Sequence, residues 1–209
     1  MNRAMADISG VLLAGGKSRR MGQDKRFIEI GGKTLVERGL TVLEKLFSEI
    51  LIVVAEPIPQ IAQYGHRIVT DIFPGSGSLG GLYTGLSHAS NLRIFSVGCD
   101  MPFLDPTVVG LIAALDRGAD IIIPRLATGL QPMHAVYSKK CLSYLEGMIT
   151  ARNFRLHELI GVAALTVRVV NEEEIRPIDP HLLSFINVNR PADLELACKV
   201  HAFQKGKFR

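Results

Sequence analysis

The chain has 209 residues, of which 47% are hydrophobic, and its mean hydropathy is positive, so we expect a single domain over residues 1–209. The net charge of +4 is concentrated in the segment from Lys17 to Arg26 and in the C-terminal tail, without the interleaved aromatic residues of nucleic-acid-binding modules, and this excludes nucleic acid as the partner. Cys99, Cys141 and Cys198 lack the spacing of a zinc site or disulfide framework, and no apolar run approaches the roughly 18 residues of a membrane span, so we expect a cytoplasmic protein.

The first predicted element is a buried parallel strand over residues 8–13, which ends at Gly15 and Gly16. Two glycines let backbone N–H groups approach an anion closely. The loop that follows gathers the basic side chains Lys17, Arg19, Arg20, Lys25 and Arg26. These cations would repel one another without a negative occupant, so the segment predicts a triphosphate-binding loop. A merely solvated basic loop is the alternative, and a Walker A loop is excluded because the glycine spacing is one residue too long.

A second and a third strand follow the basic loop. A weakly alternating segment over 27–30 leads to Thr34, which we expect to cap a helix through Leu46. Residues 49–55 form an apolar strand that prolines terminate, and residues 67–70 form a short strand whose end presents Asp71. A glycine-rich stretch then leads into a helix from about residue 79 to 89.

The fourth strand covers residues 92–98 and is followed directly by Asp100. Asp105 and Pro106 open a helix that Gly118 closes, and residues 120–124 form a fifth strand. Strands that alternate with helices predict an α/β fold, Rossmann-like, with a mostly parallel sheet and helices on both faces. Ligands of such sheets bind outside the carboxyl ends of the strands. Gly15, Asp71 and Asp100 all fall there, so we expect one cleft to hold them.

Beyond residue 125 the alternation becomes irregular. We expect a loop over 126–132, an antiparallel strand over 133–137, helices over 139–149 and 153–160, and a strand over 165–170. Three glutamates at 172–174 suggest a solvated surface. A last strand over 185–189 and a terminal helix from Arg190 complete the chain.

A second glycine motif competes with the basic loop as the ligand site. Gly75, Gly77 and Gly80 have the spacing of a dinucleotide fingerprint, with Asp100 further on. The long loop before them and Pro74 fit poorly with the tight turn that such a site requires. A dinucleotide-dependent oxidoreductase therefore remains an alternative of lower rank.

Three motifs of the chain match a known family. The first is Leu13-Ala14-Gly15-Gly16, followed by Arg20-Met21-Gly22 and Asp24-Lys25. It is similar to the signature LAGGxxxRMGxxK of the nucleotidyltransferase family, and within that family it resembles the molybdenum cofactor guanylyltransferases. Cys99 to Phe103 resembles the central motif of the family, and the segment FINVNRPADLELA resembles its C-terminal motif. The resemblance extends over residues 8–197, and it implies that the single domain divides into a nucleotide-binding half, 8–124, and an acceptor side, 125–197.

The resemblance implies roles for particular residues. A GTP-binding set would comprise Leu13, Ala14, Gly15, Lys25, Asp71 and Asp100. Within it, Lys25 and Asp100 would be catalytic, and Asp100 would hold Mg²⁺, which needs only one or two carboxylates besides phosphate oxygens and water. His134 lies in a motif on the acceptor side, but a lone histidine in a strand is more often a packed residue. Val54 is apolar where some relatives are polar, and Ser78 replaces the usual proline.

The implied reaction is the magnesium-dependent transfer of GMP from GTP to molybdenum-bearing molybdopterin, with release of pyrophosphate. Enzymes and target proteins of the cofactor pathway would be its protein partners. Use of CTP, or of a sugar phosphate as the acceptor, remains open within the same class. A non-catalytic nucleotide-binding protein is the alternative from a different class.

Overall fold

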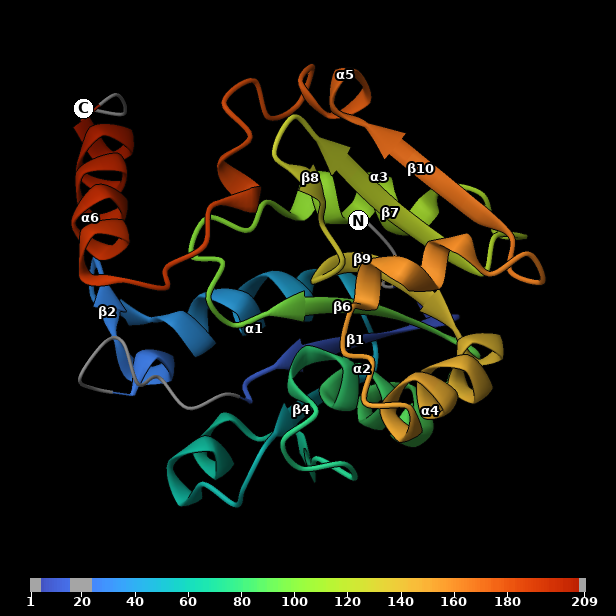
Figure 1. Ribbon diagram of the computed structural model, residues 1–209. Coiled ribbons are helices and arrows are strands. Elements are labelled where there is room, and N and C mark those ends of the chain that lie inside the picture. The colour runs from blue at the N-terminus through green and yellow to red at the C-terminus, as the bar shows by residue number, and fades with distance from the viewer. Residues whose placement is uncertain (1–4, 16–23, 207–209) are drawn as a thin grey trace.

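The computed structural model describes residues 5–15 and 24–206 and contains one large sheet (Figure 1). The basic side chains predicted at Lys17, Arg19 and Arg20 lie outside the described residues. Eight strands form the sheet, in the order β10-β7-β9-β6-β1-β4-β5, with β8 paired to β7. Their bounds are β1 Ile8–Leu13, β4 Ile50–Val54, β5 Arg67–Thr70, β6 Arg93–Gly98, β7 Ile121–Leu126, β8 Gly129–Leu130, β9 His134–Ser138 and β10 Val167–Asn171.

The sheet is mostly parallel, as the sequence predicts. Strand β1 pairs in parallel with β4 and β6, and β4 pairs in parallel with β5. Strand β9 runs antiparallel to both β6 and β7, while β10 and β7 are parallel. The carboxyl ends of β1, β4, β5, β6 and β7 therefore lie along one edge of the sheet.

Helices cover both faces of the sheet. On one face, α1 (Leu35–Leu46) and α3 (Pro106–Ala114) bury Leu12, Ile52 and Phe95 of the central strands. On the other face, α2 (Gly77–His88) and α4 (Leu142–Thr150) cover Val11 and Val53. Successive residues of a strand point to opposite faces, and helices cover both faces, which explains why every residue of β1 and β4 is buried.

Local caps fix where two helices start. The Thr34 hydroxyl accepts a hydrogen bond from the Glu37 amide at 3.2 Å, and the Glu37 carboxylate accepts one from the Thr34 amide at 2.6 Å. This capping box begins α1 at the predicted residue. Asp105 caps α3 through the Thr107 amide, and Pro106 occupies the first turn of that helix.

A small third cluster lies beside the sheet. The hairpin of β2 (Glu29–Ile30) and β3 (Lys33–Thr34) contributes Ile30, and α6 (Pro191–Gly206) contributes Ala197, to a core shared with Phe103 and Val188. Figure 1 shows α6 next to β2, at one side of the sheet. This cluster places the segment before α6 next to the β2–β3 hairpin, which comes after β1 in the sequence.

Three expectations for the C-terminal half are wrong. Residues 185–189 form no strand: Leu183–Phe185 is a 3-10 turn, and the Val188 amide donates to the Asp100 carbonyl at 2.9 Å. The apolar alternation there reflects packing of Phe185 and Val188 into two clusters. The predicted loop over 126–132 contains β8, and the helix predicted over 153–160 is the 3-10 helix Leu156–Gly161.

The acidic segment at 172–174 is also more than a solvated surface. It forms the short helix α5 (Glu172–Ile175), capped by Asn171. The Glu172 carboxylate accepts a hydrogen bond from the Ala127 amide at 2.8 Å, which ties the turn after β7 to this helix. Across the described ranges 5–15 and 24–206, no helix is both long and apolar enough to cross a membrane.

Candidate active site

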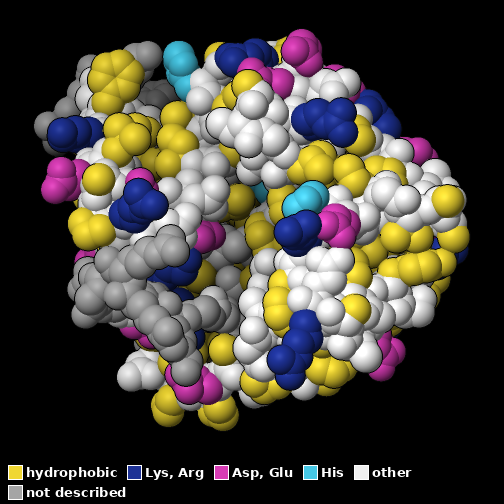
Figure 2. All heavy atoms as spheres, in the orientation of Figure 1, with side chains coloured by type: hydrophobic (Ala, Val, Ile, Leu, Met, Phe, Trp, Pro, Cys, Tyr) yellow, Lys and Arg dark blue, Asp and Glu magenta, His cyan; other side chains and the backbone are white. Residues whose placement is uncertain are grey.

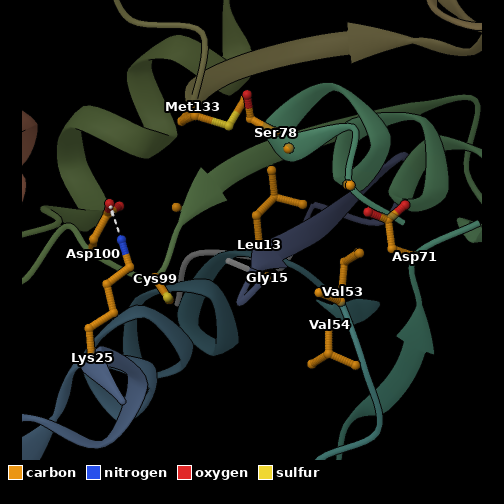
Figure 3. A pocket seen from close by; sticks show the side chains of 15 residues that line it. Leu13, Gly15, Lys25, Val53, Val54, Asp71, Ser78, Cys99, Asp100 and Met133 are labelled. Atoms are coloured by element: carbon orange, nitrogen blue, oxygen red, sulfur yellow. Dashed lines mark hydrogen bonds and ion pairs between the residues drawn. The ribbon is translucent and has the colours of Figure 1, made fainter. Parts of the chain in front are cut away.

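A cavity of about 450 Å³ opens at the carboxyl edge of the parallel strands (Figure 3). Its lining includes Leu13 at the end of β1, Gly15 just beyond it, Asp71 after β5, Asp100 after β6, and Lys25. Five of the six predicted nucleotide-binding residues are thus brought together. The shared edge of the sheet explains this convergence, because parallel strands deliver their carboxyl ends to the same side.

Ala14, the sixth predicted residue, is fully buried and does not line the cavity. Its amide donates to the Val53 carbonyl at 2.8 Å, which continues the pairing of β1 with β4 by one residue. Its carbonyl accepts a hydrogen bond from the Arg26 guanidinium at 3.1 Å. Ala14 therefore fixes the position of the backbone next to Gly15, which lines the cavity.

One end of the cavity carries a cation between two oxygen atoms. The Lys25 ammonium lies 2.8 Å from Asp100 Oδ2 and 3.4 Å from Asn189 Oδ1. The side chains of the ion pair are only 17% and 18% exposed. A partly buried cation that faces a cavity is suited to hold phosphate oxygens there.

The segment of Lys25 is fixed by its neighbours. Asp24 caps the 3-10 turn Lys25–Phe27, and its carboxylate also binds the Arg26 guanidinium through both oxygens. Burial raises the pKa of Asp24, but the hydrogen bonds from Arg26 outweigh this effect and hold the pKa below its ordinary value. Asp24 and Arg26 thereby fix the start of the turn against the Ala14 carbonyl.

Asp100 is held by backbone contacts on both sides. The Cys99 amide donates to the Leu13 carbonyl at 3.1 Å, and the Arg38 guanidinium donates to the Pro102 carbonyl at 3.2 Å. A Cβ atom at Gly98 would lie 2.5 Å from Asp100 Oδ1, so a larger residue at this position would displace the carboxylate. The predicted orientation of Asp100 toward the cleft therefore agrees with its place in the cavity lining.

The opposite end of the cavity carries a second carboxylate (Figure 3). Asp71 Oδ1 accepts hydrogen bonds from the Phe73 amide and the Thr84 hydroxyl, both at 3.0 Å. Burial raises the pKa of Asp71 above its ordinary value, against the opposing effect of these hydrogen bonds. Val53 and Val54 make this end of the lining apolar. The cavity thus carries the Lys25 cation, paired with Asp100, at one end and an apolar lining around a second carboxylate at the other.

The start of α2 forms the side of the cavity between these two ends. Gly75 and Gly77 have positive φ angles of 90° and 60°, so the predicted fingerprint glycines shape this turn. Gly77 and Ser78 line the cavity at the first turn of the helix. The unpaired amides of a helix N-terminus favour negative charge, so this turn complements Lys25 on the other side.

Comparison with known proteins identifies the family. Residues 10–165 match the model of the MobA-like NTP transferase domain. The chain belongs to this family. It is 35% identical, over 91% of each chain, to a probable molybdenum cofactor guanylyltransferase of Pelotomaculum thermopropionicum. It is 32% identical to a molybdenum cofactor guanylyltransferase of Desulfosudis oleivorans, over 92% of this chain and 95% of that protein.

A solved structure agrees with this assignment. Molybdopterin-guanine dinucleotide biosynthesis protein A of Archaeoglobus fulgidus superposes with a TM-score of 0.82 and 26% identity, covering 93% of this chain and 99% of that one. The chain is therefore a MobA-like nucleotidyltransferase, and the sequence resemblance to molybdenum cofactor guanylyltransferases is confirmed. This assignment replaces the alternative of a dinucleotide-dependent oxidoreductase, which rested on the spacing of Gly75, Gly77 and Gly80 at the start of α2.

The sequence interpretation of this MobA-like chain did not assign a role to Asn189. Asn189 lies in the C-terminal motif FINVNR. The Val188 amide donates to the Asp100 carbonyl, and this hydrogen bond places Asn189 beside the Lys25 ammonium. The sequence carried no signal for this contact, because Asn189 is an exposed residue that lies 164 positions after Lys25.

His134 is a packed residue in this member of the family. Its ring is fully buried, with ring centroids 5.4 Å from Phe95 and 4.5 Å from Phe185. Burial lowers the pKa of His134 to about 3, so the imidazole is neutral in the native protein near neutral pH. The neighbouring Met133 lines the cavity instead.

Proposed function

We propose that this MobA-like enzyme transfers GMP from GTP to molybdopterin carrying molybdenum, in a magnesium-dependent reaction that releases pyrophosphate. The observation that carries the proposal is the arrangement of Lys25, Asp100 and Asn189 at one end of a cavity whose other end presents Asp71. The names of the relatives supply the guanine nucleotide and the cofactor.

The residues present at the cationic end fit a magnesium ion. Asp100 and Asn189 already direct oxygen atoms at one cation, the Lys25 ammonium. The described residues contain no group of three or more Asp, Glu, His or Cys side chains that could enclose a metal. Magnesium does not require such a group, because it retains waters and takes phosphate oxygens alongside one or two protein ligands. Asp100 and Asn189 would hold the ion, which would neutralise charge on the phosphates of GTP.

The remaining residues position and neutralise the reactants. The terminal phosphate of the acceptor would attack the α-phosphorus in line, and the bond to the β-phosphate oxygen would break. Lys25 and the amides at the start of α2 would stabilise negative charge on the triphosphate. A phosphate monoester is already ionised near neutral pH, so the protein needs no general base. Asp71 would contact the nucleoside, and residues 8–124 would supply the nucleotide half of the enzyme.

A nucleotide-selectivity assay tests this proposal. Purified protein is incubated with Mg²⁺, molybdopterin carrying molybdenum, and GTP, CTP, ATP or UTP separately, and pyrophosphate release is measured. We expect release with GTP only, and loss of release without the acceptor. Preference for CTP would make the enzyme a cytidylyltransferase of the same fold. No release with any of the four nucleotides would refute the proposed reaction.

A further inference from the structure

Two walls of the nucleotide cavity come from different parts of the fold. Gly15 follows β1 of the large sheet, whereas Lys25 lies in the 3-10 turn Lys25–Phe27, outside that sheet. Figure 3 shows the Lys25 side chain rising from this turn, apart from the end of β1 at Gly15. Figure 2 shows the molecule from the same side as Figure 1, hollowed between the part that carries α6 and the rest. A triphosphate in contact with both walls therefore needs a turn whose position relative to β1 is fixed.

Arg26 joins the two walls behind the cavity. It directly follows Lys25, and its guanidinium donates to the carbonyl of Ala14, the residue before Gly15, at 3.1 Å. The Arg26 side chain is only 12% exposed, and it is not among the described residues that line the cavity. The sequence groups Arg26 with the cations of a triphosphate-binding loop, but the structure directs its guanidinium at the protein instead.

The contacts of Arg26 use the planar shape of a guanidinium. Its Nε donates to both carboxylate oxygens of Asp24, at 2.7 and 2.9 Å, and its Nη1 reaches the Ala14 carbonyl. One rigid group thus binds the residue before Lys25 and the residue before Gly15 at the same time. A lysine at this position would keep the charge but would lack these fixed donor directions. The ion pair with Asp24 also compensates the charge of Arg26, which leaves position as its main contribution to the cavity.

We propose that Arg26 is a positioning residue for the nucleotide, which sets the distance between the Gly15 backbone and the Lys25 ammonium through its bonds to Ala14 and Asp24. Arg26 acts through these neighbours and does not touch the phosphates. The inference rests on the proposed function in taking GTP as the ligand. Because a misplacement of about 1 Å can cost about a hundredfold in rate, loss of this bridge should impair binding and transfer together.

Kinetics and calorimetry of Arg26→Lys test the assignment. We expect kcat/KM for GTP, followed by pyrophosphate release, to fall by about a hundredfold, and the GTP affinity in calorimetry to fall as well. The KM for molybdenum-bearing molybdopterin should be unchanged, because the bridge positions residues on the nucleotide side of the cavity.

Arg176 provides a matched control. Its guanidinium also binds a carboxylate and a carbonyl: it donates to Glu172 at 2.9 Å and to the Pro180 carbonyl at 2.8 Å. These residues are not among the described residues that line the nucleotide cavity. Arg176→Lys removes the same kind of contact, so it should leave kcat, the KM for GTP and the GTP affinity unchanged. Equal losses of GTP affinity in Arg26→Lys and Arg176→Lys would overturn the inference.

Two further variants separate position from charge. Arg26→Gln should show the same defect as Arg26→Lys, because neither side chain makes the planar pair of contacts. A defect in Arg26→Gln that lysine repairs would assign Arg26 a role through charge and would overturn the inference, as would wild-type GTP affinity and kcat in folded Arg26→Lys. If the Arg26 variants do not fold, Asp24→Asn decides instead, since it weakens the same bridge and should lower GTP affinity, whereas wild-type affinity there would overturn the inference.

The proposed function and this inference can fail separately. Absence of product with the unsubstituted enzyme would refute the proposed transfer. Calorimetry with GTP needs no acceptor, so a loss of GTP affinity in Arg26→Lys alone would still support the positioning role of Arg26.

Discussion

Gly80→Ala tests whether the nucleotide cavity depends on close packing of α2 against Asp71. A Cβ atom at Gly80 would lie 2.9 Å from the Phe73 carbonyl oxygen and 3.0 Å from both carboxylate oxygens of Asp71. The backbone of Phe73 cannot move aside as a flexible side chain can, so the substitution overpacks this contact at a cost of about 1–3 kcal/mol. Alanine in a helix recovers up to about 1 kcal/mol relative to glycine.

A matched glycine provides the control. Gly147 lies within α4, and a Cβ atom there would meet no atom within 4 Å. We therefore expect Gly147→Ala to raise the free energy of unfolding by up to about 1 kcal/mol and Gly80→Ala to lower it by about 1–2 kcal/mol. Urea unfolding followed by circular dichroism measures both values, and calorimetry measures GTP affinity, which should fall only in Gly80→Ala. Equal stability of the two variants, with equal GTP affinity, would refute the close contact between α2 and Asp71.

Three further predictions concern charge. Lys25→Ala should weaken GTP binding in calorimetry while the protein stays folded, and an unchanged affinity would remove Lys25 from the site. Asp100→Asn keeps the shape of the side chain but removes its charge, so pyrophosphate release should fall by orders of magnitude, whereas wild-type turnover would show that Asp100 holds no metal. In the folded protein His134 stays unprotonated down to about pH 3, whereas an unfolded histidine binds a proton below about pH 6.5. Protonation therefore favours the unfolded chain, and His134 should lower the free energy of unfolding by about 1.4 kcal/mol for each pH unit below 6.5. The variant His134→Phe should lack this part of the pH dependence, and an identical pH profile would contradict the buried neutral histidine.

The sequence predicted the central part of this fold because local signals agreed there. Each of these signals defines an element without help from distant residues: the apolar strands that end in glycine or aspartate, the Thr34 cap, and Pro106 at the start of a helix. The structure confirms the mostly parallel sheet. The C-terminal half was harder, because its apolar residues are buried by packing on other clusters. Residues 185–189 show the apolar alternation of a strand, but Val188 packs with α6 and the β2–β3 hairpin, and Phe185 packs against His134.

The candidate site shows the same division. Strand ends placed Gly15, Asp71 and Asp100 along one edge before any contact was known, because sheet topology follows from the order of the elements. Asn189 lies far along the chain from Lys25, so only the folded structure shows that they meet.

The fate of the phosphorus atoms of GTP tests the central claim most directly. Purified enzyme, Mg²⁺ and molybdenum-bearing molybdopterin are supplied with GTP labelled either at the α-phosphorus or at the γ-phosphorus, and the products are separated and counted. The proposed transfer predicts that the α-label enters a dinucleotide form of the cofactor in equal amount to the γ-label recovered as pyrophosphate. Recovery of the γ-label as inorganic phosphate, with the α-label retained in GDP, would show hydrolysis in place of nucleotidyl transfer and would contradict the assigned reaction.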